Sequence, residues 1–378
     1  MKILTIAACP FPAPRGTPIR IERMAEALAR RGHEVHVATY HFGDGQPSPL
    51  LHLHRIAGPA RYHRSMPGPT WTKLVRLDPR LTRTVRRLLG DPYDVVHAHH
   101  VEGLLCAWRA RGQRRVPVVF DAHTLLESEL PAYGRIGGPM LRWVGRQLDR
   151  ALPPLADHVI AVSDEIREQL LRLGRITPAS VTVIGNGVET EQFPVNDARP
   201  ANAVVAFAGN FAPYQGIDLL LQGFARLAAR RPDARLRLLG TDDFAPWQGL
   251  VKRLGIEAQV QIVRLAFREL PAALAEASVL VSPRTECSGL PQKLLNYMAS
   301  GVPVVAFAGS AKLNEHGRTG LVVRNGDTDA LAQAMAQVID DPALGRSLGR
   351  AAREVVLAGH SWDQVAQRVE QVFRAVTR

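Results

Sequence analysis

Short apolar runs rich in β-branched residues alternate with longer helical stretches along almost the whole chain, and this alternation constrains the fold more than any other feature. The runs show little internal alternation of polar and apolar residues, as expected for a parallel sheet covered by helices on both faces. Repetition of strand and helix in this order predicts βαβ units and an α/β fold. The strands are expected at 2–8, 34–39, 94–98, 117–121, 158–162 and 181–184, and then at 203–208, 236–239, 260–263, 279–281, 304–307 and 320–323.

The helices between these strands are expected near 18–31, 71–89, 101–111, 137–152 and 164–173, and then near 217–231, 247–254, 268–277, 291–300, 327–340, 343–357 and 361–377. A polar stretch with two prolines, 188–202, interrupts the pattern and is predicted to be a linker. The chain has 378 residues, enough for two domains with separate cores. We therefore expect an N-terminal domain over 1–187, joined by the last helix over 361–378, and a C-terminal domain over 203–360. A binding cleft is expected between the carboxyl ends of their strands.

Composition narrows the class of protein. With 46% hydrophobic and 22% charged residues, the chain has the balance of a globular protein. No apolar run approaches the length of a membrane-spanning helix, and the apolar start stops at Pro10, too early for a signal peptide. Three cysteines (Cys9, Cys106 and Cys287) lie far apart without metal-ligand spacing, which favours free thiols in a reducing cytoplasm.

The formal charge of +12 is concentrated in residues 1–185, which indicates an anionic partner for the N-terminal domain. Its most basic segment is 55–87, in which Asp78 is the one acidic residue. On the helix expected there, one face carries leucines (74, 77, 81 and 88) and another carries arginines (76, 80, 83 and 87). A solvated face of a core helix and a peripheral contact with anionic lipid are equally good interpretations; lipid would contribute about 1 kcal/mol per basic residue. Nucleic acid is disfavoured, because aromatic residues do not interleave with the charge.

Two motifs of the first half could contact a ligand. The first strand leads through a proline-rich loop to Gly16 and a helix start, where backbone N–H groups could meet an anion beside Arg15 and Arg20. A rigid surface loop explains this segment equally well. His123 follows the strand at 117–121, at the carboxyl end where active sites of parallel sheets gather. Taken alone, a structural hydrogen-bonding role is favoured for it.

Two further loops follow strands in the middle of the chain. The strand at 181–184 is followed by Asn186-Gly187-Val188, which indicates a tight turn at the domain junction. The strand at 203–208 leads through a glycine-containing loop over 209–216 to a helix. Its spacing is not that of a dinucleotide fingerprint or a phosphate loop, so it is a weak phosphate-site signal by itself.

The longest motif runs from 282 to 305. It predicts a strand end, a loop and a helix that begins near Pro291 and ends at Gly301. The N-terminus of this helix points back at the loop, so a diphosphate could bind there beside Arg284 and Lys293. Asn296, one turn further on, could hydrogen-bond a neutral hydroxyl. A plain βαβ crossover is the weaker alternative, because many polar groups converge here.

Taken in order, these five motifs resemble the family-four retaining glycosyltransferases (glycosyl transferases group 1) of the GT-B fold, which have two facing Rossmann-like domains with an interdomain cleft. The similarity covers nearly the whole chain. It continues through Gly-Arg-Thr-Gly-Leu-Val-Val at 317–323 and through a terminal helix after Trp362, which is expected to cross back to the first domain. Each motif is modest alone, whereas the ordered set at these spacings is specific.

The resemblance implies a hexosyltransferase with a UDP- or GDP-sugar on the C-terminal domain and an acceptor on the N-terminal domain. The anomeric configuration would be retained without a metal ion or another cofactor. Gly16 is expected beside the donor phosphates or the acceptor, and His123 near the transferred sugar. The catalytic residues implied are His123, Glu286 and Asn296. The donor-binding residues implied are Arg15, Gly16, Asn210, Gln215, Arg284, Ser288, Gly289, Leu290, Lys293 and Lys312.

Several positions depart from the family pattern. The Arg and Lys of the family's glycine loop correspond to Asn210 and Gln215, and three family glutamates correspond to Ser288 or Glu286, to Asn296 and to Lys312. Each lost cation would weaken stabilisation of the leaving diphosphate by several kcal/mol in a dry site. We hypothesise that Arg284, Lys293 and Lys312 replace the lost cations and that Asn296 holds the ribose.

The leading prediction is sugar transfer to a lipid-linked or polysaccharide acceptor in cell-envelope glycan synthesis, in the cytoplasm or peripherally at the inner face of the membrane. The replaced residues favour an alternative, a GT-B protein without turnover that serves as a binding or scaffolding subunit. A sugar-nucleotide epimerase on the same architecture is disfavoured by the turn at 186–188 and the block at 283–305.

Overall fold

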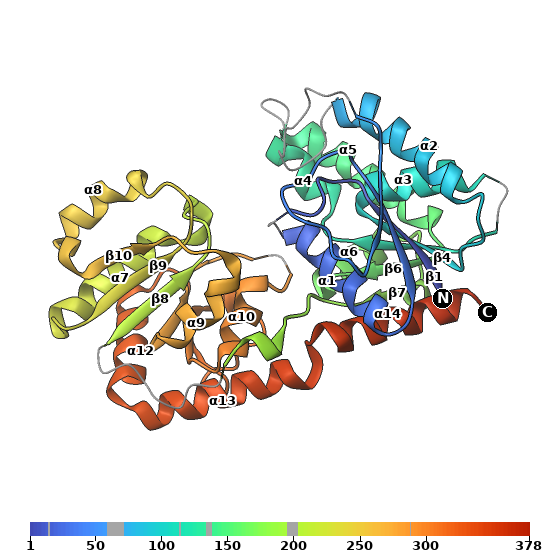
Figure 1. Ribbon diagram of the computed structural model, residues 1–378. Coiled ribbons are helices and arrows are strands. Elements are labelled where there is room, and N and C mark those ends of the chain that lie inside the picture. The colour runs from blue at the N-terminus through green and yellow to red at the C-terminus, as the bar shows by residue number, and fades with distance from the viewer. Residues whose placement is uncertain (14–15, 59–71, 113–114, 134–137, 195–202, 288) are drawn as a thin grey trace. The chain divides into compact units, whose positions relative to one another are not determined.

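The computed structural model describes the chain except residues 14–15, 59–71, 113–114, 134–137, 195–202 and 288, and it divides into two compact units. The first unit comprises Met1–Asn186 and Trp362–Arg378, and the second comprises Gly187–Ser361. Each unit contains one parallel sheet with helices on both faces (Figure 1). The predicted α/β class with two Rossmann-like domains is therefore confirmed. Most of the predicted linker, 195–202, lies outside the described residues.

The first unit has a seven-stranded sheet in the order β3-β2-β1-β4-β5-β6-β7, and every pairing is parallel. The order reverses between β1 and β4, the point at which open α/β sheets bind ligands outside their carboxyl ends. The strands are β1 (Lys2–Ala7), β2 (Glu34–Thr39), β3 (His52–Arg55), β4 (Val95–His99), β5 (Val118–Ala122), β6 (His158–Ala161) and β7 (Val181–Val183).

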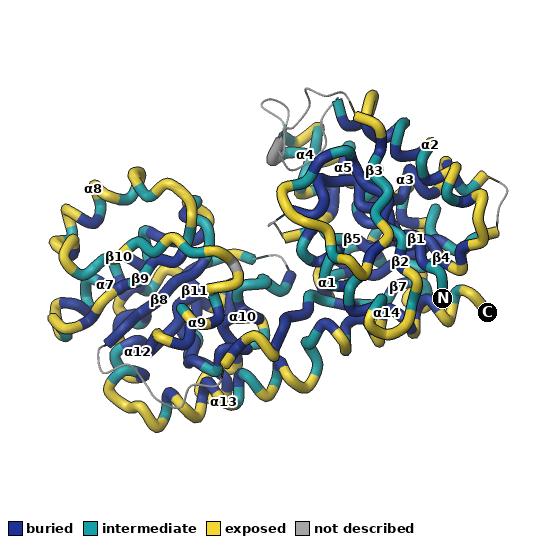
Figure 2. The backbone as a smooth tube through the Cα atoms, in the orientation of Figure 1, coloured by how far each residue is buried: buried dark blue, intermediate teal, exposed yellow. Residues whose placement is uncertain are grey.

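Helices cover both faces of this sheet. On one face α1 (Gly16–Arg30) packs beside the C-terminal helix α14 (Trp362–Val376), and Met24 and Phe373 share a core cluster. On the other face lie α2 (Asp78–Leu88), α3 (His100–Arg111) and α6 (Asp164–Arg172). Two further helices, α4 (Leu126–Tyr133) and α5 (Gly138–Ala151), pack against each other. Figure 2 shows the strands buried and the outer faces of the helices exposed.

The second unit has a six-stranded parallel sheet in the order β10-β9-β8-β11-β12-β13, which reverses between β8 and β11. Its strands are β8 (Val204–Ala208), β9 (Arg235–Leu239), β10 (Val260–Val263), β11 (Val279–Ser282), β12 (Val304–Phe307) and β13 (Leu321–Val323). One face is covered by α7 (Ile217–Arg230), α8 (Ala245–Leu254) and α12 (Thr328–Asp340). The other is covered by α9 (Leu270–Ala275), α10 (Gln292–Ser300) and α13 (Pro342–Gly359).

Short helices complete the chain. The four-residue α11 (Ala308–Ala311) follows β12, and 3₁₀ turns lie at Pro153–Leu155, Pro178–Ser180, Thr190–Gln192, Pro213–Gln215, Glu257–Gln259 and Phe267–Glu269. No helix among the described residues is both long and apolar enough to cross a membrane.

The helix predicted over 71–89 differs in its first turn. Lys73–Leu77 forms a π-helical turn ahead of α2, in which the Asp78 amide donates to the Lys73 carbonyl. Pro79 has no N–H for the α-helical bond to the residue four positions before it, so a wider turn costs little here. The turn also corrects the predicted apolar face: Leu74 is 44% exposed, whereas Lys73 and Leu77 are buried.

Candidate functional site

Two loops meet at the reversal point of the second sheet. The loop over 209–216 follows β8, and the loop over 283–291 follows β11, its neighbour in the sheet. Gly216 has a φ of 74°, and a Cβ there would overlap the Pro283 carbonyl. Only glycine allows both the left-handed backbone and this close approach. The two sequence motifs are thereby held together at the carboxyl edge.

Lys293, in the first turn of α10, reaches across to the loop after β8. Its Nζ donates a short hydrogen bond to Gln215 Oε1 and lies 4.2 Å from the centroid of the Phe207 ring. Burial, and secondly the charge of the nearby Arg284 guanidinium, lower the pKa of Lys293 to about 7. No described carboxylate lies within ion-pair distance of this ammonium. The site thus contains a desolvated cation without a counter-charge.

The predicted donor-binding residues of the two loops form one network. Gln215 Nε2 donates to Asn210 Oδ1 at 3.1 Å, and Asn210 Nδ2 donates to the Tyr214 hydroxyl at 2.8 Å. The Arg284 guanidinium carbon lies 5.0 Å from the centroid of the Tyr214 ring. These contacts connect two cationic side chains, Lys293 and Arg284, through the neutral amides of Gln215 and Asn210 and the Tyr214 ring. Tyr214 was missed by the sequence analysis, although it stands between Asn210 and Gln215.

The N-terminus of α10 faces the same loops. Pro291 is its N-cap residue and provides no side-chain cap, while Gly289 before it has a φ of 65°. Asn296, one turn into the helix, is only 4% exposed, yet no hydrogen bond joins its carboxamide to any described residue. Its polar atoms are not among the fully buried, unpartnered side-chain atoms of the described residues, so the carboxamide keeps some contact with solvent and is accessible to a ligand.

The segment 284–287 is positioned by residues that the motif analysis did not single out. Asn325 Nδ2 donates to the Thr285 carbonyl at 2.9 Å, and Asn325 Oδ1 accepts from the Gly309 amide at 2.9 Å. A Cβ on Gly309 would overlap the Thr285 carbonyl. In the sequence Gly309 is only a glycine after a predicted strand. Nothing in a single sequence connects it with Thr285, 24 positions earlier.

The remaining predicted residues of this domain are less enclosed. Glu286 is exposed on the loop after β11, and Leu290 packs partly against the core. Lys312 is exposed just after α11 and has a φ of 48°, in the left-handed region. Ser288 lies outside the described residues.

At the carboxyl edge of the first sheet, His123 belongs to a buried cluster. Its Nε2 lies 3.0 Å from His99 Nδ1 and 3.5 Å from Asp121 Oδ1, and its ring stacks on His100 at 4.7 Å. Only 6% of its side chain is exposed. Burial holds the pKa of His123 well below its usual value despite the opposing charge of Asp121. His123 is therefore a neutral imidazole at physiological pH. His100 has a φ of 60°, a strained conformation typical of functional sites.

The structure corrects the role predicted for Arg20. Its guanidinium is 2% exposed and donates to the Ile184 and Gly185 carbonyls at 2.8 and 2.7 Å. It also pairs with Asp121 at 3.1 Å. Burial alone would raise the pKa of Asp121, but Arg20 and then the histidines outweigh it and hold that pKa well below its usual range. Arg20 orients the histidine cluster and is not available to an anion.

The same cluster contains three groups close enough to hold a metal ion, namely His97, His99 and Asp121. The Arg20 guanidinium already occupies the carboxylate, however, and a divalent ion beside it would meet direct charge repulsion. These residues fit a hydrogen-bonded support for His123 better than a metal centre.

Gly16 is the first residue of α1, two positions before the start predicted for this helix. The residue is exposed, and a Cβ built there would meet no atom within 4 Å. The chain could thus approach a ligand closely at this helix start. Arg15 lies outside the described residues.

Family models and a similar sequence both relate this chain to glycosyltransferases. Residues 14–192 match the model of Glycosyltransferase Family 4, and residues 202–341 match that of Glycosyl transferases group 1. A D-inositol 3-phosphate glycosyltransferase of Mycobacterium leprae (strain TN) is 30% identical over 95% of this chain and 88% of its own length.

Solved structures share the fold over the whole chain. Sucrose-phosphate synthase from Thermosynechococcus elongatus superposes with a TM-score of 0.80 at 23% identity, covering 99% of this chain and 98% of its own. Anabaena HepE in complex with UDP and glucose superposes with a TM-score of 0.74 at 19% identity, covering 99% of each chain.

Proposed function

Because the chain belongs to the family 4 (group 1) glycosyltransferases, and is thus a glycosyltransferase with a nucleotide-sugar donor, we propose that it binds a UDP- or GDP-sugar at the Lys293 network. It would transfer a hexose with retention of anomeric configuration to an acceptor held by the first unit. The observation that carries this proposal is the desolvated ammonium of Lys293, which has no described carboxylate to neutralise it. Such an unpaired cation is costly to the folded protein and is typical of a site that receives an anion.

The chemistry of transfer requires positive charge where the diphosphate leaves. We propose that Lys293 and Arg284 provide it together with the N-terminus of α10, and that Lys312 approaches from the loop after α11. Lys293 replaces the cations missing from the loop after β8, since its ammonium lies beside Gln215, one of the two positions at which the family has a cation. Asn210 and Gln215 would then hold Lys293 in place.

Further roles follow from the burial of the remaining residues. The carboxamide of Asn296, which makes no hydrogen bond to a described residue, is suited to a ribose hydroxyl, and Glu286 to a hydroxyl of the sugar. His123, a neutral imidazole held by His99 and Asp121, would hydrogen-bond the transferred sugar and not serve as a cation. Transfer would need no metal ion, because the two cations already stabilise the leaving group.

The acceptor is proposed to be an anionic or lipid-linked saccharide or polyol in cell-envelope glycan synthesis. Residues 1–185 carry most of the net charge of +12, which favours an acceptor with phosphate or a membrane surface. The names of two similar proteins, D-inositol 3-phosphate glycosyltransferase and sucrose-phosphate synthase, both include a phosphorylated small molecule.

Peripheral contact with anionic lipid is proposed for the segment 55–87, of which 59–71 lies outside the described residues. Val75 is 65% exposed and Leu74 44% exposed, beside the exposed Arg76 and Arg83. Exposed apolar side chains next to arginines are suited to the interface of an anionic bilayer. Co-sedimentation with anionic vesicles should fall in a Leu74→Ser, Val75→Ser variant, and equal binding would leave the face as ordinary solvated surface.

The donor site is tested by a thermal-shift screen against UDP, GDP and their common sugar conjugates. A ligand at 100 times its dissociation constant should stabilise the protein by about 2.7 kcal/mol. Lys293→Ala and Arg284→Ala should abolish this shift, whereas Lys252→Ala, at an exposed lysine of α8, should retain it. Unchanged affinity in the first two variants would contradict the proposed donor site.

The alternative, a binding subunit without turnover, is favoured by the neutral residues Asn210 and Gln215. It predicts nucleotide binding without release of UDP or GDP from any sugar conjugate. Measurable transfer or slow hydrolysis of the donor would eliminate it.

A further inference from the structure

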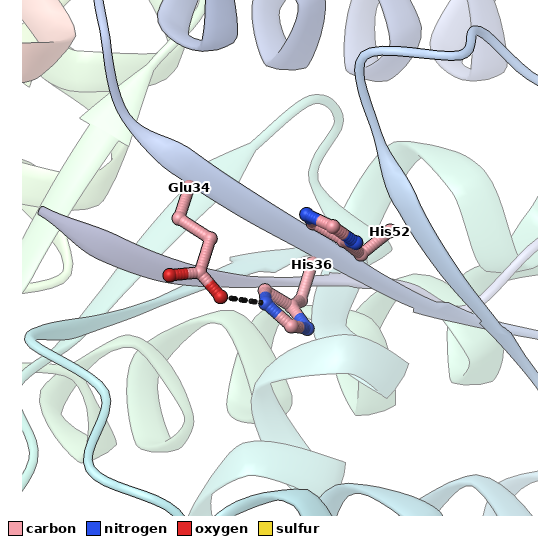
Figure 3. Close-up of side chains that lie close together, drawn as sticks. All are labelled: Glu34, His36 and His52. Carbon is pink, nitrogen blue, oxygen red and sulfur yellow. Dashed lines mark hydrogen bonds and ion pairs between the residues drawn. The ribbon is translucent and has the colours of Figure 1, made fainter.

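The first sheet carries a group of imidazoles on its two outermost strands at one edge, β2 and β3. Glu34 and His36 are two residues apart on β2, and His52 and His54 are two residues apart on β3, so the side chains of each pair point to the same face of the sheet. The strand register places His36 directly beside His52. Figure 3 shows Glu34, His36 and His52 pointing toward one another.

We propose that Glu34, His36 and His52 form a binding site for one divalent transition-metal ion of the zinc type. One ligand atom from each of the three residues lies within 4.8 Å of the others. His36 Nε2 lies 2.7 Å from Glu34 Oε1, and the rings of His36 and His52 stack at 4.6 Å. Two imidazoles and a carboxylate are ligands that Zn²⁺ accepts with a fourth position left to water.

His54 supplies the orientation that such a site needs. Its Nε2 lies 2.9 Å from His36 Nδ1. In the ion-free protein His36 Nε2–H donates to Glu34 Oε1 at 2.7 Å; when an ion displaces this proton to solvent, His54 can accept the Nδ1–H of His36 and leave His36 Nε2 as the ligand atom. His54 is thus a positioning residue for His36.

Two cations lie near the cluster and compete with a metal ion. Lys2 Nζ pairs with Glu34 Oε1 at 3.6 Å, and the charge of Arg87 acts on His54. Lys2 is partly exposed and also lies over the Tyr93 ring at 5.0 Å, so its ammonium can leave the carboxylate without becoming buried alone. Zn²⁺ would replace this exposed pair, which is itself worth little.

The place of the cluster indicates what the ion would do. Glu34 begins β2 and His52 begins β3, at the amino ends of the strands, whereas ligands of open α/β sheets bind at the carboxyl ends. β3 is a four-residue edge strand held to the sheet through β2 alone. An ion bridging Glu34 and His36 to His52 would fasten this edge strand and would take no part in sugar transfer.

The proposal is tested by titrating the full-length protein, freed of metal by a chelator, with Zn²⁺ in a calorimeter. One ion per chain should bind, and X-ray absorption of the complex should show nitrogen ligands at about 2.0–2.1 Å. Hydrogen exchange at β3 should slow when the ion is bound. These measurements need no nucleotide, so they remain interpretable whatever the outcome of the donor-binding screen.

Variants separate this site from other histidines. His52→Ala and Glu34→Gln remove exposed ligands and should weaken Zn²⁺ binding at least tenfold without altering the circular dichroism spectrum. His54→Ala should weaken it by about 10-fold to 100-fold through loss of the positioning hydrogen bond. His316→Ala, at an exposed histidine of the second unit, should leave binding unchanged. Absence of stoichiometric binding, or equal binding in His52→Ala and Glu34→Gln, would overturn the proposal.

Discussion

At the scale of single residues, the donor site depends on the protonation of Lys293. Its ammonium has a pKa of about 7 in the absence of ligand because burial removes it from water. A diphosphate beside it favours the charged form and should raise that pKa. We therefore predict that UDP binding takes up close to one proton per chain at pH 8 and almost none at pH 6, where Lys293 is already charged. Affinity for UDP should fall as the pH rises above 7.

Calorimetry in two buffers of different ionisation enthalpy measures this proton uptake directly. The Lys293→Met variant removes the titrating group while keeping most of the side-chain volume, so any weak UDP binding that remains at higher concentrations than those of the thermal-shift screen should lose the uptake. An uptake at pH 8 that persists in this variant would assign the proton to another group.

Lys293 also affects the stability of the protein without ligand. Its pKa is lower in the folded than in the unfolded protein, so the unfolded protein binds more protons between these two values. The free energy of unfolding should therefore rise from pH 7 toward pH 10 through this group.

His123 leads to a second prediction at this scale. Since burial keeps it neutral to well below pH 6.5, the rate of sugar transfer should show no step from His123 between pH 6 and 8. His123→Ala should lower kcat by about 100-fold if the imidazole donates a hydrogen bond in the transition state. The matched control is His158→Ala, at the amino end of β6 in the same sheet. Equal effects of the two substitutions on kcat would show that His123 has only a structural role.

At the scale of elements, substituting two glycines with similar positive φ values distinguishes the cost of backbone strain from the cost of steric overlap. Gly216 and Gly255 have φ values of 74° and 66°, but a Cβ would overlap the Pro283 carbonyl only at Gly216. Gly255→Ala should cost about 1 kcal/mol of unfolding free energy, which is the strain alone. Gly216→Ala should cost about 3 kcal/mol or more and should also weaken UDP binding, because it separates the loops after β8 and β11. Chemical denaturation and thermal shift with UDP measure both effects, and equal costs would contradict the steric argument.

Some of the elements could be predicted from sequence patterns, and others could not. Strands such as β1 and β12 were predicted within a residue or two, because buried parallel strands are continuous apolar runs. β3 was missed because its sequence, His-Leu-His-Arg, is polar, as a half-exposed edge strand permits. The contact between Lys293 and Gln215 joins positions 78 apart on different elements, and no local pattern contains it. Arg20 was misassigned for the same reason, since its burial depends on Asp121 and the chain after β7.

At the scale of the whole molecule, charge is divided between the two halves of the chain. Residues 1–185 carry most of the net charge of +12, so an acceptor or membrane bound there is attracted largely by solvent-exposed cations. Salt screens such charges over about 10 Å at 0.1 M, whereas partly buried groups such as Lys293 are screened much less. The two proposed substrates should therefore respond differently to ionic strength.

We predict that raising the salt concentration from about 50 mM to about 500 mM increases KM for an anionic acceptor, or weakens binding to anionic vesicles, by at least about tenfold. The dissociation constant for UDP, measured on the same protein, should change several-fold less. The control is the thermal stability of the unliganded chain over the same range, which must stay high enough for both assays. A donor affinity that falls as steeply as acceptor affinity would mean that exposed charge, and not the enclosed cations of α10 and the loop after β11, binds the diphosphate. In that case the Lys293 network would need another explanation, since a site that salt screens fully cannot supply the charge stabilisation that a departing diphosphate requires.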